Sequence, residues 1–295
     1  MPNALPFEPR ALTGILYMIA AVSLFPLMNA TVKYLGNAGY PVGEVIWARY
    51  VGHFVWAALF FMPRGGVRIL RTARPGLQLL RSALLFSCTA VYFIAIQHLD
   101  LTMAAAISFT SPIIVTALSV PMLGEQVGIR RWIAVVVGFA GALLVIRPGG
   151  DSFHWAMLLV AFNAFAYAFY QLLTRKAASE PPETSMIWSA IVGAVVASFL
   201  LIDGFELPRT AWHWVLFLSM GFIGGIGHYF VVKAFQHATV AVVTPFSYFQ
   251  LVGATTLGFF IFGDIPDRWT WVGASIIVGS GLYITWREQK KKKKA

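Results

Sequence analysis

Long apolar runs, separated by short polar connections, form the main pattern along this chain. A helix needs roughly 20 apolar residues to cross a hydrocarbon core about 30 Å thick, and the runs here reach that length. The pattern predicts ten membrane-spanning helices, at 12–35, 42–62, 77–97, 102–123, 129–147, 154–174, 185–203, 212–235, 239–263 and 269–286. We therefore expect an all-α integral membrane protein in which short loops join the helices and no soluble domain is inserted.

Amino-acid composition supports the prediction of a membrane protein. Hydrophobic residues make up 58% of the chain and charged residues 12%, whereas a soluble domain usually has about 25% charged residues. The formal net charge of +10 raises the question of nucleic-acid binding. The basic residues lie mostly at the ends of apolar runs, however, so we expect no nucleic-acid partner. The first apolar run has no clear cleavage site, and we expect no signal peptide.

Lysine and arginine residues in the short loops predict the orientation, because cytoplasmic loops carry an excess of them. With the N-terminus in the cytoplasm, sixteen of them fall on the cytoplasmic side and four on the opposite side. The larger group includes Arg81 and the basic tail 290–294. Arg49 and Lys233 lie inside spans and are left out of the comparison. We expect both termini to lie in the cytoplasm.

Polar landmarks recur between the two halves of the chain at an offset of 139 residues. Residues 95–99, with the sequence AIQHL, match residues 234–238, with the sequence AFQHA. The other pairs in this register are Ser108 with Ser247, Phe109 with Tyr248, Gly124 with Gly263, Glu125 with Asp264 and Trp132 with Trp271. Five spans in each half is an odd number, so we expect residues 151–295 to lie inverted relative to residues 1–150. Accidental similarity between apolar segments is the alternative.

The repeated pattern resembles the EamA-type members of the drug/metabolite transporter superfamily. It is carried by Ala95, Gln97, His98, Ala104, Ala105, Ala106, Pro112, Gly124, Glu125, Trp132, Gly138 and Gly141, and by a weaker second copy from Ala234 to Gly281. The resemblance implies ten helices, cytoplasmic termini in a bacterial inner (plasma) membrane, and a cavity lined by helices 1, 3, 4, 6, 8 and 9. It also implies export or exchange of small metabolites. Asp264 and Pro245 depart from the pattern of the second copy.

The substrate expected from this resemblance is a small molecule carried by alternating access, with a hydrophobic or aromatic amino acid favoured. Cationic drugs and nucleotide-like metabolites are competing substrates, and a channel or an intramembrane enzyme is the alternative from another class. No aspartate or glutamate lies deep inside a predicted span, whereas ion-coupled transporters commonly use buried carboxylates. We therefore expect facilitated diffusion or exchange rather than strict proton antiport, by a chain that works as a monomer in the lipid bilayer.

The sequence contains no recognisable catalytic or metal-binding constellation, so we expect neither enzyme activity nor a metal or other cofactor. Its six histidines form no HExxH motif, and no GxSxG nucleophile motif occurs. The glycine-rich residues 221–227 lie inside an apolar span with no preceding strand, which argues against a nucleotide-binding loop. The expected role of Gly221 and Gly225 is close helix packing.

Polar and aromatic side chains inside the predicted spans are the candidate substrate-binding residues, because such groups are costly in hydrocarbon. Arg49 lies more than one turn inside its span, where it either binds a substrate carboxylate or braces the carbonyls of a neighbouring helix. The sequence leaves both roles open. The full candidate set is Asn29, Arg49, His53, Tyr92, Ser108, Ser111, Asn163, Tyr167, Tyr170, Gln171, His228, Tyr229, Lys233, Tyr248 and Gln250.

Overall fold

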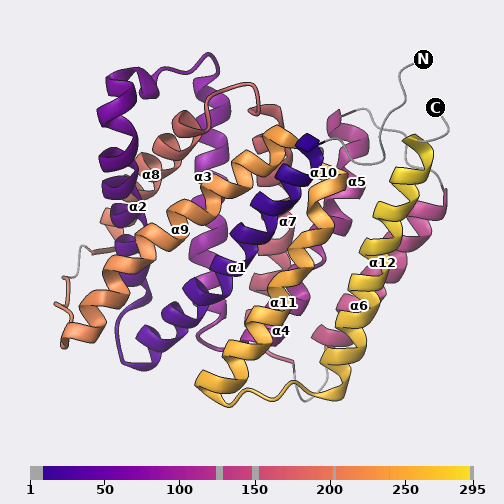
Figure 1. Cartoon of the computed structure of the whole chain (residues 1–295). Helices are drawn as coiled ribbons and strands as arrows, with labels where there is room; N and C mark the ends of the chain where they lie inside the picture. Colours follow the sequence, from indigo (N-terminus) through magenta and orange to yellow (C-terminus); the bar gives the residue numbers. More distant parts are fainter. Residues whose placement is uncertain (1–8, 124–128, 148–152, 202–203, 239, 293–295) are drawn as a thin grey trace.

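The computed structural model describes residues 9–123, 129–147, 153–201, 204–238 and 240–292 as a bundle of helices (Figure 1). Within these ranges there is no β-strand. Six helices are long and apolar enough to cross a membrane: α1 (Pro9–Asn37), α2 (Val42–Gly65), α3 (Pro75–Ala95), α7 (Ala156–Lys176), α8 (Pro182–Ser198) and α9 (Ala211–His237).

The other elements are shorter or carry charges at one end. They are η1 (Gly66–Leu70), α4 (Leu101–Ser108), α5 (Ser111–Leu123), α6 (Ile129–Ile146), η2 (Phe199–Leu201), α10 (Val240–Val243), η3 (Thr244–Phe249), α11 (Gln250–Leu257), η4 (Gly258–Phe262) and α12 (Arg268–Lys292). The segments η1, η2 and η3 are 3₁₀ turns, and η4 is a π-helical turn.

Two of the predicted spans are interrupted in the structure. The span predicted at 102–123 is divided into α4 and α5, which meet at residues 109–110. Pro112, at the second position of α5, has no amide hydrogen and cannot bond to the carbonyl one turn earlier. The span predicted at 239–263 consists of α10, η3, α11 and η4, and Pro245 lies in the first turn of η3. Both interruptions lie beside the central cavity described below.

The helices form a central group and a separate pair. α1 packs against α9, η3 and α11. α2 packs against α3, α8 and α9, and α3 packs against α7 and α8. α6 and α12 lie side by side at one edge of the bundle (Figure 1). Small residues allow their close approach, since a Cβ atom on Gly141 would lie 3.0 Å from the carbonyl oxygen of Gly273. The central group of helices, without this pair, lines the cavity described below.

The two copies of the Gln-His landmark lie at opposite ends of α1. Near the start of α1, a Cβ atom on Gly14 would lie 2.8 Å from the Cβ atom of Ala238. Near its end, Gly36 faces the side chain of Gln97, whose amide donates a hydrogen bond to the carbonyl of Val32 at 3.4 Å. α1 has 29 residues, which corresponds to a length of about 43 Å. An inverted repeat requires this arrangement, although the division of the chain into two halves stays a prediction.

Candidate functional site

A cavity of about 120 Å³ lies inside the central group of helices. It is lined by α1, α2, α3, the junction of α4 and α5, α7, α9 and the junction of η3 and α11. Among the predicted residues, those that line it are Asn29, Arg49, Tyr92, Ser108, Ser111, Asn163, Tyr167, Gln171, His228 and Gln250. α2 contributes Arg49, and this helix was absent from the lining set that the family resemblance implied.

Arg49 places a positive charge in the wall of this cavity. Its side chain is fully buried, and none of its three guanidinium nitrogens has a hydrogen-bond partner among the described residues. Its guanidinium carbon lies 4.3 Å from the centre of the Tyr50 ring, which is a cation–π contact. Gly224 of α9 leaves room for the side chain, since a Cβ atom there would lie 3.2 Å from Arg49 Nε. Of the two roles left open by the sequence, bracing of helix carbonyls is not seen in the described part of the chain.

Amide side chains from several helices surround the same space. Asn29 comes from α1, Asn163 and Gln171 come from α7, and Gln250 begins α11. The Gln171 amide donates a hydrogen bond to the hydroxyl of Ser111 at 3.2 Å. An amide offers both donors and acceptors. The cavity therefore provides neutral hydrogen-bonding groups around a single buried cation.

Aromatic rings form much of the remaining wall. The rings of Phe25 and His228 lie with their centres 5.0 Å apart, and Phe109 and Tyr167 come from the α4–α5 junction and α7. Tyr167 also stacks on the buried Tyr170 at 5.5 Å between ring centres. Aromatic rings pair in offset-stacked or edge-to-face arrangements rather than directly face to face. Aromatic rings and amide side chains therefore share the wall of the cavity.

Three predicted residues lie in a separate groove or beside it. His53 and Tyr229 line a hollow between α2, α8 and α9. His53 shares a face of α2 with Arg49, but the packing of α9, where Gly224 faces Arg49 and Gly225 faces His53, places the two side chains in different hollows. Lys233 lies with its ammonium nitrogen 5.6 Å from the centre of the Tyr229 ring. These three residues are not in the lining of the central cavity, and their assignment to substrate binding stays a prediction.

Tyr170 and Tyr248 are also outside the lining of the central cavity. Tyr170 is fully buried behind Tyr167, and its hydroxyl accepts a hydrogen bond from Arg81 at 3.3 Å. Tyr248 packs edge-on against Phe109, with ring centres 5.2 Å apart. Each ring packs against a residue of the cavity wall, Tyr170 against Tyr167 and Tyr248 against Phe109. Neither ring lines the cavity itself.

Arg81 is a second buried arginine, and the loop-charge prediction misplaced it. The structure places it in α3 with 1% of its surface exposed. Its Nε donates to the side-chain amide oxygen of Gln78 (Oε1) at 3.3 Å, and Nη1 donates to the Tyr170 hydroxyl at 3.3 Å. Nη2 donates to the Ser189 hydroxyl at 2.9 Å and to the backbone carbonyl of Ser185. These bonds join α3 to α7 and α8, so Arg81 holds the bundle together.

One end of the bundle is closed by a buried ion pair. The Lys33 ammonium lies 3.1 Å from an Asp264 carboxylate oxygen, and both side chains are about one-tenth exposed. Lys33 also donates to the carbonyl of Leu99, and Asp264 accepts from the amide of Leu101. Burial, and secondarily the nearby Asp264 carboxylate, raise the pKa of Asp100 in the loop between α3 and α4. The cluster joins the end of α1 to two loops.

The opposite end of the bundle is closed around Glu180. Its carboxylate accepts hydrogen bonds from the Thr72 hydroxyl, at 2.6 and 2.7 Å, and from the Gln78 amide at 2.8 Å. The Gln236 amide donates to the backbone carbonyl of Glu180 at 3.0 Å. Gln236 belongs to the second copy of the Gln-His landmark, and Gln97 of the first copy makes the equivalent kind of contact at the other end.

A bundle of long apolar helices around a central cavity is the architecture of a multi-pass membrane protein. The model of the EamA-like transporter family matches this chain twice, over residues 12–147 and 154–286, and the chain belongs to that family. The predicted family and the ten-helix membrane fold are confirmed, as is the prediction that the protein is not an enzyme.

Curated relatives over nearly the whole chain are also transporters. A riboflavin transporter of Rhizobium johnstonii is 30% identical, over 99% of this chain and 97% of its own length. An S-adenosylmethionine uptake transporter of Rickettsia felis is 29% identical, over 95% and 94%. A pseudopaline exporter of Pseudomonas aeruginosa is 27% identical, over 90% and 93%. These names support a metabolite transporter and do not single out amino acids.

A solved crystal structure has the same fold. It aligns with a TM-score of 0.68 at 19% identity, over 96% of this chain and 98% of that chain.

Proposed function

We propose that the protein carries a planar, ring-bearing metabolite whose carbonyl or carboxylate oxygens bind Arg49, with riboflavin as the first candidate. The observation that carries this proposal is the buried Arg49 guanidinium, which has no hydrogen-bond partner among the described residues. A guanidinium presents five N–H donors in a planar fork. Substrate oxygens would satisfy these donors and offset the cost of a buried charge.

The neighbours of Arg49 support a ring-bearing substrate. Phe25, Phe109 and Tyr167 offer ring faces, and Asn29 and Asn163 offer amide donors and acceptors. Riboflavin has a flat fused ring system with two carbonyl groups on one edge and a hydroxylated chain on the other. Two relatives, from Rhizobium johnstonii and Vibrio cholerae, are named as riboflavin transporters at 30% and 29% identity.

An aromatic amino acid is the second candidate. Its carboxylate would form a charge-assisted, bidentate pair with Arg49, which is stronger than bonds to neutral carbonyls. Its ring would then lie against the aromatic wall. A cationic drug is disfavoured, because Arg49 would place a like charge beside it in a site of low dielectric constant.

The size of the cavity supports transport by alternating access. At about 120 Å³, it is smaller than the roughly 300–1,000 Å³ of ordinary small-molecule sites. We propose that the structure represents one state of the transport cycle, in which the Lys33–Asp264 pair and the hydrogen bonds of Glu180 hold the two ends of the bundle together. The described part of the chain has no carboxylate in the lining of the cavity, so we propose exchange or facilitated diffusion as the mode of transport.

The orientation and assembly belong to the same proposal. With Arg81 buried inside α3, fifteen of the sixteen basic residues remain on the side assigned to the cytoplasm. This excess supports cytoplasmic termini, and we place the protein in a bacterial inner membrane. One chain supplies all the residues that line the cavity, which supports a functional monomer in the lipid bilayer.

Counterflow in proteoliposomes tests the proposal. The full chain is reconstituted, the vesicles are loaded with unlabelled riboflavin, and entry of labelled riboflavin is measured with and without a pH gradient. Phenylalanine, tryptophan and S-adenosylmethionine are tested in parallel. We expect saturable riboflavin exchange that needs no gradient and that falls at least tenfold in Arg49→Gln, the effect expected from losing a charge-assisted hydrogen bond of about 1.5–3 kcal/mol.

Arg130→Gln is the matched control, because Arg130 is an exposed arginine at the start of α6, away from the cavity. Its exchange rate should equal that of the unmodified chain. Tryptophan exchange without riboflavin exchange would select the second candidate. Riboflavin exchange that is unchanged in Arg49→Gln would refute the assignment of Arg49 to the substrate.

A further inference from the structure

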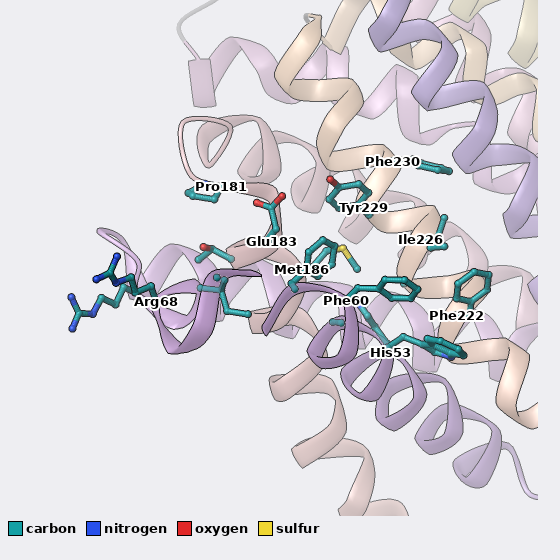
Figure 2. Close-up of a pocket in the computed structure, with 18 residues that line it drawn as sticks. His53, Phe60, Arg68, Pro181, Glu183, Met186, Phe222, Ile226, Tyr229 and Phe230 are labelled. Atoms are coloured by element: carbon teal, nitrogen blue, oxygen red, sulfur yellow. The ribbon is translucent and has the colours of Figure 1, made fainter. Parts of the chain in front are cut away.

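A larger hollow lies on the outside of the bundle, between α2, α8 and α9 (Figure 2). This lateral groove has a volume of about 800 Å³ and shares no lining residue with the central cavity. Trp56, Phe60 and Phe222 line it and are still 37–46% exposed. Large exposed rings on a membrane-spanning face contact acyl chains, so the lateral groove opens toward the bilayer.

The two ends of the lateral groove differ in chemistry. At one end are two exposed arginines, Arg68 in η1 and Arg71 directly after it, and Glu183 lies in the first turn of α8. At the other end is His53, which is fully buried and has no hydrogen-bond partner among the described residues. From His53 to Gly65 is twelve residues, or about 18 Å of helix. That length is close to the ~15 Å of hydrocarbon in one leaflet.

The charged end of the lateral groove favours an anion. Arg68 and Arg71 form no ion pair with the described residues. In Figure 2, Arg68 and Phe222 lie at opposite ends of the lateral groove, and the Arg68 side chain points away from Phe222. Residues just beyond a membrane-spanning helix lie at the depth of the lipid headgroups. Basic pockets between such helices bind anionic headgroups. Glu183 opposes part of this charge, which leaves an excess of one positive charge.

We propose that the lateral groove binds one anionic phospholipid, with its phosphate on Arg68 and Arg71 and one acyl chain along the aromatic wall toward His53. The lining is mainly apolar, which suits an acyl chain better than a water-soluble ligand. Glu183 disfavours a second negative charge, so a headgroup with a single phosphate, such as phosphatidylglycerol, fits better than a doubly charged one. A zwitterionic lipid would place its own ammonium beside the arginines and bind less tightly.

Native mass spectrometry of the full chain in detergent tests this proposal. The chain is titrated with phosphatidylglycerol and, separately, with phosphatidylcholine of identical acyl chains. We expect one phosphatidylglycerol to be retained with clear preference. The double variant Arg68→Gln/Arg71→Gln should bind it about 30-fold more weakly, since each arginine near a bilayer surface contributes roughly fivefold. Both side chains are exposed, so the substitutions should leave the fold intact.

A second measurement locates the lipid. Phosphatidylglycerol with a photoreactive group on its acyl chain should cross-link to peptides of α2, α8 and α9. Arg130→Gln serves as the control, because it removes one exposed arginine far from the lateral groove. The proposal is overturned if the two lipids bind equally, if the double variant binds like Arg130→Gln, or if the cross-links map to other helices.

Discussion

Arg49 and Arg81 are both buried arginines inside this bundle, and they have opposite surroundings. Arg81 donates hydrogen bonds from all three of its guanidinium nitrogens, to groups on α3, α7 and α8. Arg49 has no such bond among the described residues, and one face of its guanidinium lies over the Tyr50 ring beside an open cavity. The two residues share identity and burial, so the difference lies in their hydrogen-bond partners.

This difference is the basis for proposing a binding role for Arg49 and a structural role for Arg81. A buried charge is tolerated when hydrogen bonds satisfy it, and its removal then leaves the partners unsatisfied. A buried charge without partners costs stability in the empty protein and is retained where a ligand completes it. Burial of a charged residue in a span therefore does not distinguish the two roles by itself. The presence or absence of hydrogen-bond partners for its donors distinguishes them.

The largest expected effect is the loss of stability in Arg81→Ala. This change would remove one hydrogen bond each from the Tyr170 hydroxyl, the Ser189 hydroxyl and the Gln78 side-chain amide oxygen in the interior. We expect the free energy of unfolding to fall by about 3–5 kcal/mol, the range for removing one member of a buried charged network. Thermal unfolding of the purified chain in detergent measures the change. Arg130→Gln should unfold like the unmodified protein, and equal midpoints for all three proteins would show that the Arg81 network does not hold the bundle.

The next effect has the opposite sign. Arg49→Met replaces an unpartnered charge by an apolar side chain of similar length. We expect the empty protein to gain about 1–2 kcal/mol of stability, as seen when buried charges give way to packed apolar groups. The same variant should lose stabilisation by added riboflavin, which raises the unfolding temperature of the unmodified chain by mass action. If Arg49→Met were as destabilising as Arg81→Ala, the two arginines would share a structural role.

The sequence predicted the membrane fold well, because the length of an apolar run is fixed by the thickness of the bilayer. It predicted the spans at 102–123 and 239–263 as continuous helices. Proline signals were present there, but hydropathy alone does not report where a helix is interrupted. Ten of the fifteen candidate residues line the cavity, since a polar group in a span usually faces the bundle interior.

The rest of the site depended on contacts between helices that no single span encodes. Arg81 was counted with the loop residues because it lies near the start of its span. Gln78, Arg81 and Ser82 nevertheless share one helix face by their spacing, and Ser185 and Ser189 do so on α8. These two polar helix faces, one on α3 and one on α8, were the sequence signal for a hydrogen-bond network between the two helices. The same reasoning does not separate His53 from Arg49, because both lie on one face of α2 and only the packing of α9 divides them.

The smallest expected effect concerns the charged cluster around Lys33 and Asp264. The extent to which its charges are paired is intermediate between that of Arg81 and that of Arg49. The Lys33–Asp264 pair is satisfied, but Asp100 lies beside it as an additional carboxylate, and Asp267 lies in the same loop as Asp264. Burial raises the pKa of Asp100 above its ordinary 3.8. Burial alone would raise the pKa of Asp267 as well, but hydrogen bonds from Thr270 and the nearby Arg147 lower it. The two carboxyls therefore respond to acid with opposite sign.

Between neutral pH and about pH 4, close to the ordinary pKa of an aspartate, Asp100 should dominate the response. Its raised pKa means that the folded chain takes up a proton more readily than the unfolded chain in this window. Stability should therefore rise as the pH falls, by less than about 1 kcal/mol because the group is only half-buried. Below that window the protonation of Asp267 should reverse the trend. Unfolding midpoints measured against pH test this, with Asp100→Asn as the variant in which the rise disappears. A rise in stability that persists in Asp100→Asn would assign the titration to another group. Asp100 would then not be the source of the acid response at this end of the bundle.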